Sequence, residues 1–292
     1  MREVIDSLHI LIQHLLPQHL LSALAFRLTR CRVPLIKDFL VHRFIRAFAV
    51  NMSEARVQEP EQFECFNDFF TRELRSGARP MTVDEDAVVS PVDGRISQVG
   101  IITGGQILQA KGREYSVTAL LGGATFPNAT RYEDGEFITL YLSPRDYHRI
   151  HMPASGRLRR AVYVPGKLFP VNEASVARVD RLFARNERVI CEFDTAFGAM
   201  SVCMVGALFV GSMETVWHGQ VTPTRDRRIR ELQGTDGDAA GSRRRGEELG
   251  RFNMGSTVIL LFEKDRLRWD ASLRTGSPVR VGQLLGKRPE HP

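Results

Sequence analysis

The sequence predicts an α+β protein, with a β-rich core of packed antiparallel sheets and a few helices preceded by an amphipathic helical segment. Residues 1–55 carry apolar side chains at helical spacing, which predicts the helices. From about residue 85, short apolar runs alternate with Gly, Pro and Asp turns, which predicts the strands. The 292 residues are 43% hydrophobic and 25% charged, as in an ordinary globular protein.

Two apolar stripes predict the helical segment. Residues 7–26 contain no Lys, Arg, Asp or Glu, but Pro17 and several His and Gln side chains interrupt the run. A membrane span needs about 20 mostly apolar residues, so we expect a short amphipathic helix instead. Its apolar positions are Val4, Ile5, Leu8, Ile12, Leu15 and Leu16. Pro34 suits the first turn of a second helix. The stripe of that helix comprises Leu35, Ile36, Phe39, Leu40, Phe44, Ile45 and Phe48.

The residues leave two roles open for this segment. It is either a cap that packs on the body of the protein, or an interfacial anchor whose apolar faces enter the headgroup region of a membrane. In the second case its arginines would contact anionic lipid. These are Arg27, Arg30, Arg32, Arg43 and Arg46. We place the end of the segment at residue 55 and assign residues 56–292 to a second domain.

The second domain is predicted to be mostly strands. The strand candidates are residues 88–99, 137–142, 157–164, 188–193, 199–210 and 257–262. Residues 200–210 are almost continuously apolar, which indicates a strand in the core, and residues 172–186 are predicted to be helical. The Gly-, Asp- and Arg-rich stretch 234–250 is predicted to be a surface loop, with Arg243-Arg244-Arg245 as a solvated face.

Charge and cysteine content exclude some functional classes. The formal charge of +6 suits an anionic membrane surface or nucleic acid. Nucleic acid is not expected, because no zinc-finger, RNP or helix-turn-helix signature accompanies the basic residues. The four cysteines form no C-x-x-C pair, so we expect neither a metal site nor a disulfide framework. No secretory signal or transit peptide is evident, so we expect an intracellular protein.

The most informative motif is Met254-Gly255-Ser256-Thr257, which precedes the apolar run 258–262. A small Gly carbonyl followed by a hydroxyl residue is the local chemistry that lets a Ser side chain attack the preceding peptide bond. Ser256 needs a base to become a nucleophile, and imidazole is the natural base near neutral pH.

Two other stretches supply an acid and two imidazoles. His148 and His151 lie in Tyr147-His148-Arg149-Ile150-His151-Met152-Pro153, and Asp93 lies on the tight turn Ser90-Pro91-Val92-Asp93-Gly94. A Ser-His-Asp set is therefore available, with Asp93 orienting an imidazole that serves Ser256.

Each of these elements has another interpretation. Asp93-Gly94 alone is most often a simple turn, and two His with an Asp can hold zinc, although no second ligand cluster is nearby. A lipid hydrolase would use Ser256 as a lasting nucleophile, but no G-x-S-x-G elbow is present. A lipoyl- or phosphocarrier-like module would instead need a modified Lys or His and would leave the chain uncut.

Taken together, the motifs resemble the phosphatidylserine decarboxylases, pyruvoyl-dependent enzymes of the proteobacterial and mitochondrial type. The resemblance runs from about residue 60 to 265. It includes, in order, Phe69-Phe70-Thr71-Arg72-Glu73-Leu74-Arg75, the Asp93 and His motifs, Phe183-Ala184-Arg185-Asn186-Glu187-Arg188-Val189, Gly206-Ala207 with Val210-Gly211-Ser212, and Gly246-Glu247-Glu248-Leu249-Gly250-Arg251-Phe252 before Gly255-Ser256-Thr257. Family members commonly carry Leu where Met254 stands, a similar apolar volume that is expected to preserve processing.

The resemblance implies a proenzyme that cuts itself between Gly255 and Ser256. The family assigns Asp93, His151 and Ser256 to this cleavage, which leaves chains 1–255 and 256–292 as a heterodimer. Ser256 becomes a pyruvoyl group that forms a Schiff base with phosphatidylserine, and no metal is expected. His148 is the family's candidate for supporting decarboxylation and supplying the proton that yields phosphatidylethanolamine. How the two steps divide between His148 and His151, and whether the heterodimer dimerises further, stay open.

A lipid substrate favours the anchor role of residues 1–55. The reacting carboxylate lies in the lipid headgroup, so the active site must lie near the membrane surface. We therefore expect a peripheral protein on the cytoplasmic face of the bacterial inner membrane, in contact with anionic lipid.

Overall fold

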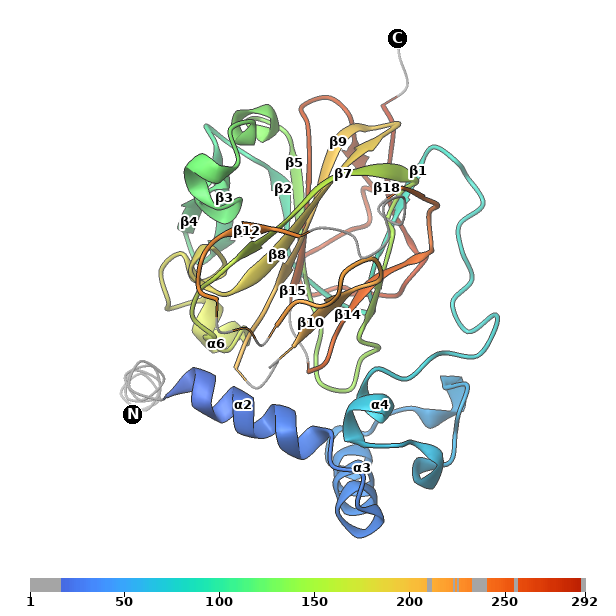
Figure 1. Cartoon of the computed structure of the whole chain (residues 1–292). Helices are drawn as coiled ribbons and strands as arrows, with labels where there is room; N and C mark the ends of the chain where they lie inside the picture. The colour runs from blue at the N-terminus through green and yellow to red at the C-terminus, as the bar shows by residue number, and fades with distance from the viewer. Residues whose placement is uncertain are drawn as a thin grey trace.

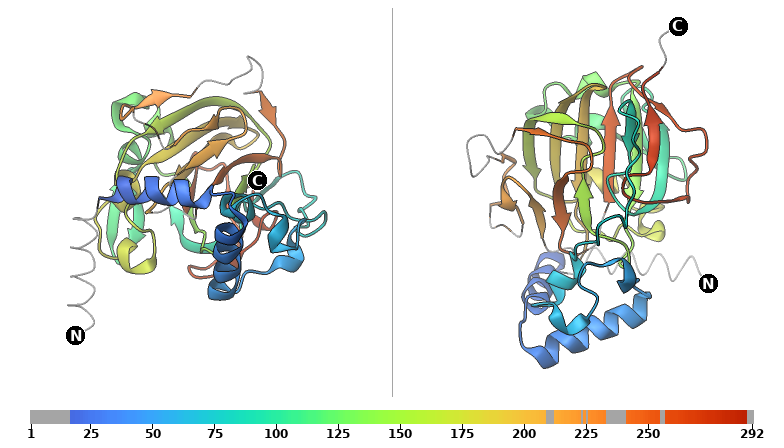
Figure 2. Two further views of the ribbon diagram at one scale, coloured as in Figure 1. Left: turned by 60° about the horizontal axis from the view of Figure 1, so that its bottom comes forward. Right: turned by 90° about the vertical axis from the view of Figure 1, so that its right-hand side faces the viewer.

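The computed structural model places one large antiparallel sheet at the centre of the protein and three helices together at one end of it (Figures 1 and 2). It describes residues 17–208, 212–222, 224, 226–232, 241–254 and 257–289. The first predicted helix, Gly255 and Ser256 lie outside the described residues. The predicted α+β class with a β-rich core is confirmed.

The large sheet has nine strands, and β15 (Thr257–Phe262) lies in its interior. Its strand order is β12-β7-β8-β9-β15-β5-β2-β17, with β13 also paired to β7. The long strands are β2 (Gly94–Ile101), β5 (Glu136–Tyr141), β7 (Gly156–Val164), β8 (Arg188–Thr195) and β9 (Gly198–Val205). The short ones are β12 (Arg230–Glu231), β13 (Ser242–Arg243) and β17 (Pro278–Val279). Thr257 is in register with Tyr141 of β5 on one side and Val205 of β9 on the other.

Three smaller sheets surround the large one. The four-stranded sheet has the order β11 (Gly219–Gln220), β10 (Met213–Thr215), β14 (Glu248–Phe252), β6 (Arg149–His151). The three-stranded sheet has the order β1 (Ala87–Val89), β18 (Leu284–Lys287), β16 (Arg268–Trp269), and β3 (Gln106–Ala110) pairs with β4 (Arg113–Ser116). The single turns of helix are η1 (Met52–Glu54), η2 (Pro60–Gln62), η3 (Gly123–Thr125), η4 (Ala129–Tyr132), α5 (Val117–Leu120), α6 (Glu173–Val176) and α7 (Leu182–Arg185).

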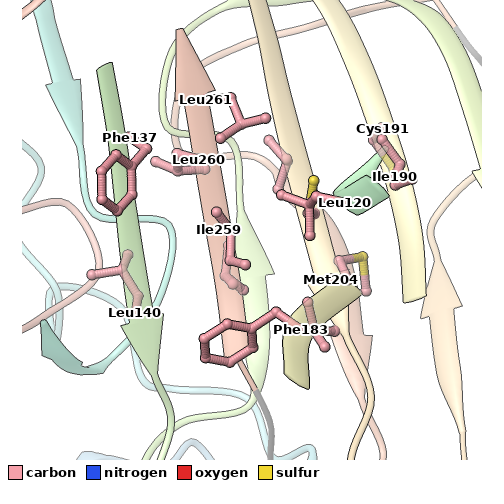
Figure 3. Packing of buried hydrophobic residues seen from close by; sticks show 14 of the residues in the cluster. Leu120, Phe137, Leu140, Phe183, Ile190, Cys191, Met204, Ile259, Leu260 and Leu261 are labelled. Carbon is pink, nitrogen blue, oxygen red and sulfur yellow. The ribbon is translucent and has the colours of Figure 1, made fainter. Parts of the chain in front are cut away.

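The main apolar core lies on the large sheet (Figure 3). Every residue of β15 is buried, which explains why its sequence is a continuous apolar run rather than an alternating one. Phe137 and Leu140 of β5 and Met204 of β9 pack beside it, and Leu120 and Phe183 join the same cluster from α5 and α7.

The helical end consists of α2 (Gln18–Thr29), α3 (Pro34–Phe48) and α4 (Phe66–Phe70). The predicted helix beginning at Pro34 is confirmed. One face of α3 packs against α4 in a second apolar cluster, whose buried members are Val41, Val50, Phe63, Phe66, Phe69 and Phe70. Large apolar side chains on other faces are exposed, namely Leu20, Leu24 and Leu28 of α2 and Leu35, Ile36, Phe39 and Phe48 of α3. Within the described part of the chain, no helix combines the length and apolar character that crossing a membrane requires.

Three predicted elements differ from the structure. The strand expected at 88–99 is two strands, β1 and β2, because Pro91 and the Ser90 hydroxyl, which donates to the Val92 carbonyl at 2.7 Å, form a turn between them. The strand expected at 199–210 ends at Val205. The helix expected at 172–186 is two separate turns, α6 and α7.

The basic triplet 243–245 is not wholly a solvated face. The guanidinium group of Arg245 donates to the carbonyl oxygens of Thr82 (2.8 Å), Asp84 and Ala87 (3.1 Å). It therefore ties the described end of the predicted loop to the segment before β1, and β14 begins within the loop, at Glu248.

Candidate active site

The predicted cleavage bond is flanked by strands of two different sheets. Glu248–Phe252 forms β14 of the four-stranded sheet, and Thr257–Phe262 forms β15 of the large sheet. Gly255 and Ser256 join these strands in sequence and lie outside the described residues.

Asn253 is held by hydrogen bonds on every side. It is buried, and its amide nitrogen donates to the Ser212 hydroxyl at 2.7 Å and to a Glu214 carboxylate oxygen at 2.8 Å. Its amide oxygen accepts from the side chain of Asn67 in α4 at 3.1 Å. Because removing one partner would leave buried polar groups unpaired, this network fixes the chain two residues before Gly255.

Met254 contacts both apolar clusters and lines a cavity of about 270 Å³. We call this space the apolar cavity. It lies between the helical end and the large sheet, and its lining includes Phe44, Phe48, Phe70, Leu142, Leu208 and Met254. An uncharged, mostly apolar space thus begins at the residue before Gly255.

His148 lies fully buried beside the end of β14. Its carbonyl accepts from Phe252 N at 3.0 Å, and its ring is 4.1 Å from the ring of Phe70, which lines the apolar cavity. Nδ1 lies 2.8 Å from the Asp146 carbonyl, which can only accept, so Nδ1 carries the proton. Nε2 is buried and has no hydrogen-bond partner among the described residues. Burial, helped by the charge of Arg72, lowers the pKa of His148 to about 3. His148 is therefore a neutral imidazole with an unused acceptor.

His151, the last residue of β6, has both ring nitrogens engaged. Nδ1 lies 2.8 Å from the Gly246 carbonyl and so donates to it, while Nε2 lies 3.0 Å from the Tyr147 hydroxyl and accepts from it. Its backbone N–H donates to the Pro91 carbonyl at 2.8 Å, which brings the turn containing Asp93 next to β6. Burial lowers the pKa of His151, although the Gly246 carbonyl opposes the shift.

Asp93 lies close to His151 in the fold, but its carboxylate is bound to other groups. It accepts two bonds from Arg79 Nε, at 2.9 and 3.0 Å, and one from Val281 N at 2.9 Å. Arg79 also donates to Glu54 at 2.7 Å. In this structure the group that orients His151 is therefore the Gly246 carbonyl, whereas Asp93 pairs with Arg79. The expected hydrogen bond from an imidazole N–H to the Asp93 carboxylate is not among those of the described residues.

Three residues of this site were not identified from the sequence. Tyr147 precedes His148 directly, so its position within the His motif was a usable signal. Asn253 lies two residues before the predicted cut and was equally close to a recognised motif. Arg79 offered no such signal, because its pairing with Asp93 joins segments that form no shared pattern in the sequence.

Comparison with known proteins finds a family that the chain resembles over most of its length. The family model described as Phosphatidylserine decarboxylase matches residues 66–287, and a model described as PSD matches residues 8–49. The chain is 50% identical over 283 residues to the phosphatidylserine decarboxylase proenzyme of Azotobacter vinelandii, covering 97% of this chain and 98% of the relative. It is 49% identical over 282 residues to the proenzyme of the same name from Hahella chejuensis, covering 97% and 94%. With that of Methylococcus capsulatus it shares 50% identity over 276 residues, covering 94% of each.

Proposed function

This chain belongs to the phosphatidylserine decarboxylase family, and on that premise we propose that it converts phosphatidylserine into phosphatidylethanolamine and carbon dioxide. The proposal includes self-cleavage between Gly255 and Ser256, which leaves chains 1–255 and 256–292 and a pyruvoyl group at residue 256. Asp93, His151 and Ser256 act in the cleavage, and His148 acts in decarboxylation.

One observation carries the proposal: Nε2 of His148 is buried and has no hydrogen-bond partner in the part of the chain that the structure describes. A buried polar atom without a partner is costly, and such atoms are often functional. This one lies beside β14, which leads to Gly255, and against Phe70 of the apolar cavity. The position of this acceptor supports the proposal that a reacting group forms at residue 256 and that His148 transfers protons for it.

The pyruvoyl group, once formed, supplies a keto carbon that condenses with the substrate amine and takes up the electron pair released with carbon dioxide. The protein must manage the accompanying protons. A substrate ammonium has to lose one proton before it condenses, and neutral His148 can accept it at Nε2. The same proton then returns to the carbon that carbon dioxide has left. The water lost on condensation is replaced when the product amine is freed, and that amine takes one proton from solvent, which balances the uptake of one proton for each carbon dioxide released.

The environment of His148 suits both transfers. Burial and Arg72 keep the imidazole neutral before substrate arrives, so Nε2 carries no proton and can accept one. A substrate carboxylate beside Nε2 raises the pKa of His148, because an opposite charge favours the protonated form. The Asp146 carbonyl holds the other nitrogen throughout, which fixes the ring orientation.

His151 is suited to the cleavage step. It is neutral at pH 7, since burial lowers its pKa, and Nε2 already accepts a hydroxyl hydrogen from Tyr147. In our proposal the Ser256 hydroxyl takes the place of that partner and gives its proton to Nε2. Asp93 supports His151 through the turn whose Pro91 carbonyl holds the His151 backbone.

A phospholipid substrate also gives a role to the helical end. We assign residues 1–55 to membrane association and residues 56–292 to the decarboxylase domain. Exposed apolar residues of α2 and α3 lie beside exposed Arg27, Arg43 and Arg46, a combination that suits the interface of an anionic membrane. The apolar cavity adjoins α3 and suits the apolar part of the lipid. We place the protein peripherally on the cytoplasmic face of the cell membrane.

Denaturing gels and mass spectrometry of the purified protein, with a carbon dioxide release assay on carboxyl-labelled phosphatidylserine, test this function. We expect chains 1–255 and 256–292 from the wild type, with the second blocked at its N-terminus. Ser256→Ala should leave one inactive chain, and His151→Ala should strongly impair cleavage. His148→Ala should be cut yet release no carbon dioxide. An intact wild-type chain that decarboxylates the lipid would overturn the mechanism.

A further inference from the structure

A second cavity, of about 310 Å³, is lined by Asp93 and Tyr147 and is rich in arginine. We call it the arginine pocket. Its basic lining residues are Arg72, Arg79, Arg95, Arg145 and Arg280, and its acidic ones are Glu54, Asp93 and Asp146. Cations thus outnumber carboxylates around this space.

The arginines of the pocket differ in how they are paired. Arg79 is bound to Asp93 and Glu54, and Arg280 lies 3.3 Å from Glu54. Arg145, by contrast, makes no ion pair within the described part of the chain. The carboxylate of Asp146 lies near enough to feel the charge of Arg145, but its hydrogen bond is from Ser143 N, at 2.7 Å.

Arg72 gives the strongest indication that the arginine pocket binds an anion. Its residue is only 6% exposed, and Nη2 donates to the Arg145 carbonyl at 3.3 Å, but Nε is buried with no hydrogen-bond partner among the described residues. A buried charged group is expected to be paired and hydrogen-bonded, so a buried guanidinium in the wall of this cavity favours an anion there. Burial lowers the pKa of Arg72 to about 10, which still leaves it charged at neutral pH.

The place of the pocket indicates which anion fills it. Ala49 and Asn51, directly after α3, line its mouth, so it opens beside the helix with the exposed apolar face. It has no lining residue in common with the apolar cavity, and neither His148 nor Met254 lines it. Its lining does include Asp93 and Tyr147 of the site described above, so a phosphate bound here lies next to that site. Arginine donors match phosphate oxygens in geometry and charge.

We propose that the arginine pocket binds the phosphodiester of an anionic phospholipid, at the edge of the site that contains Asp93 and Tyr147. The lipid as the source of the phosphate rests on the proposed function, whereas the capacity to bind phosphate rests on the pocket alone. Such a contact would attach the end of α3 to an anionic membrane surface.

Binding of short-chain phosphatidylglycerol and of inorganic phosphate, each measured by calorimetry, tests this proposal. Phosphatidylglycerol has neither amine nor carboxylate, so its binding does not depend on decarboxylation. The variants are Arg72→Gln and Arg145→Gln, and Arg157→Gln, an exposed arginine on β7 outside the pocket, is the matched control. Chain cleavage and the thermal midpoint report whether each variant folds.

We expect roughly 10- to 100-fold weaker phosphatidylglycerol binding for either pocket variant, because each removes a charge-assisted hydrogen bond, and no change for Arg157→Gln. If Arg72→Gln fails to fold, the phosphatidylglycerol binding of Arg145→Gln alone tests the proposal. Equal binding by all variants overturns the proposal, as does inorganic phosphate that binds more tightly than the lipid. A raised KM for short-chain phosphatidylserine in the same variants supports the proposal too, because the substrate carries the same phosphodiester. A protein that binds phosphatidylglycerol as expected but releases no carbon dioxide would disprove the proposed function alone.

Discussion

His148 and His151 lie three residues apart, and the structure gives them different surroundings. His148 is fully buried and uses one nitrogen, whereas His151 has a partner on each nitrogen. Both are neutral at pH 7 because burial lowers their pKa values. The residue with the unused acceptor is suited to meet a substrate, and the residue already bonded to a hydroxyl is suited to activate one.

The buried neutral state of His148 predicts a loss of stability in acid. Its pKa is near 6.5 in the unfolded chain and about 3 in the fold, so between these values only the unfolded chain binds the proton. Stability is therefore full above pH 6.5 and falls as the pH drops towards 3. His148 alone should lower the free energy of unfolding by about 2 kcal/mol between pH 7 and pH 5.

Urea unfolding at both pH values, in a Ser256→Ala background that keeps one chain, measures this loss. The added variant His148→Gln cannot titrate and should lose about 2 kcal/mol less than its parent over the same interval. His19 and His151, whose pKa values are also lowered, are present in both proteins and cancel. If the free energy of unfolding falls equally in the two proteins between pH 7 and pH 5, the fold does not hold His148 neutral.

The candidate residues could be predicted from the sequence because each lies in a short motif. Their partners could not, because the partners come from distant segments. The guanidinium group of Arg79 binds the carboxylate of Asp93 across a loop. The carbonyl of Gly246, just before β14, accepts a hydrogen bond from the ring of His151. A Ser-His-Asp pattern therefore identified the residues, whereas which group orients which ring depends on tertiary contacts.

At the scale of elements, α3 carries two apolar faces with different roles. One face packs on α4. The other face carries Leu35 and Phe39, which are exposed to solvent, and the exposed fraction of Phe39 is 66%. Phe39→Asp should leave chain cleavage unchanged and weaken binding to vesicles containing phosphatidylglycerol about 10- to 100-fold, since burial of one large apolar side chain contributes about 1.5–3 kcal/mol. Co-sedimentation measures this.

Val83→Asp is the matched control for that experiment. Val83 is 93% exposed, so the same change of chemistry is made away from α3. Vesicle binding by Val83→Asp should equal that of the wild type. Equal weakening by both variants would point to the added negative charge rather than to the face of α3.

Strands were easier to predict than the helix at 172–186. The strands corresponding to β5, β7, β8 and β15 are confirmed because buried apolar runs bounded by turns mark them clearly. The helix is broken by the buried side chain of Gln109, which donates to the carbonyls of Val176 and Val179 and accepts from Leu182 N. A residue from β3 thus replaces helical hydrogen bonds. The sequence of residues 172–186 alone could not predict such a contact, because Gln109 lies far from them along the chain.

At the scale of the whole molecule, the predicted cut would divide a continuous fold. Segment 256–292 contributes β15 to the interior of the large sheet, where each of its six residues is in register with β5 and with β9. It also contributes β16 and β18 to the three-stranded sheet and β17 to the edge beside β2. Figure 3 shows Ile259, Leu260 and Leu261 within the core.

We therefore expect the two chains to stay together after cleavage. Separating them would expose the buried side chains of β15 and break its backbone hydrogen bonds on both sides, which amounts to unfolding the core. Native mass spectrometry should give one species with the summed mass of chains 1–255 and 256–292, and the chains should separate only at the denaturant concentration that unfolds the sheet. Ser256→Ala, as the uncut control, should unfold at a similar concentration. A small chain that dissociates while the large chain keeps its strand content would contradict the placement of β15 in the centre of the sheet.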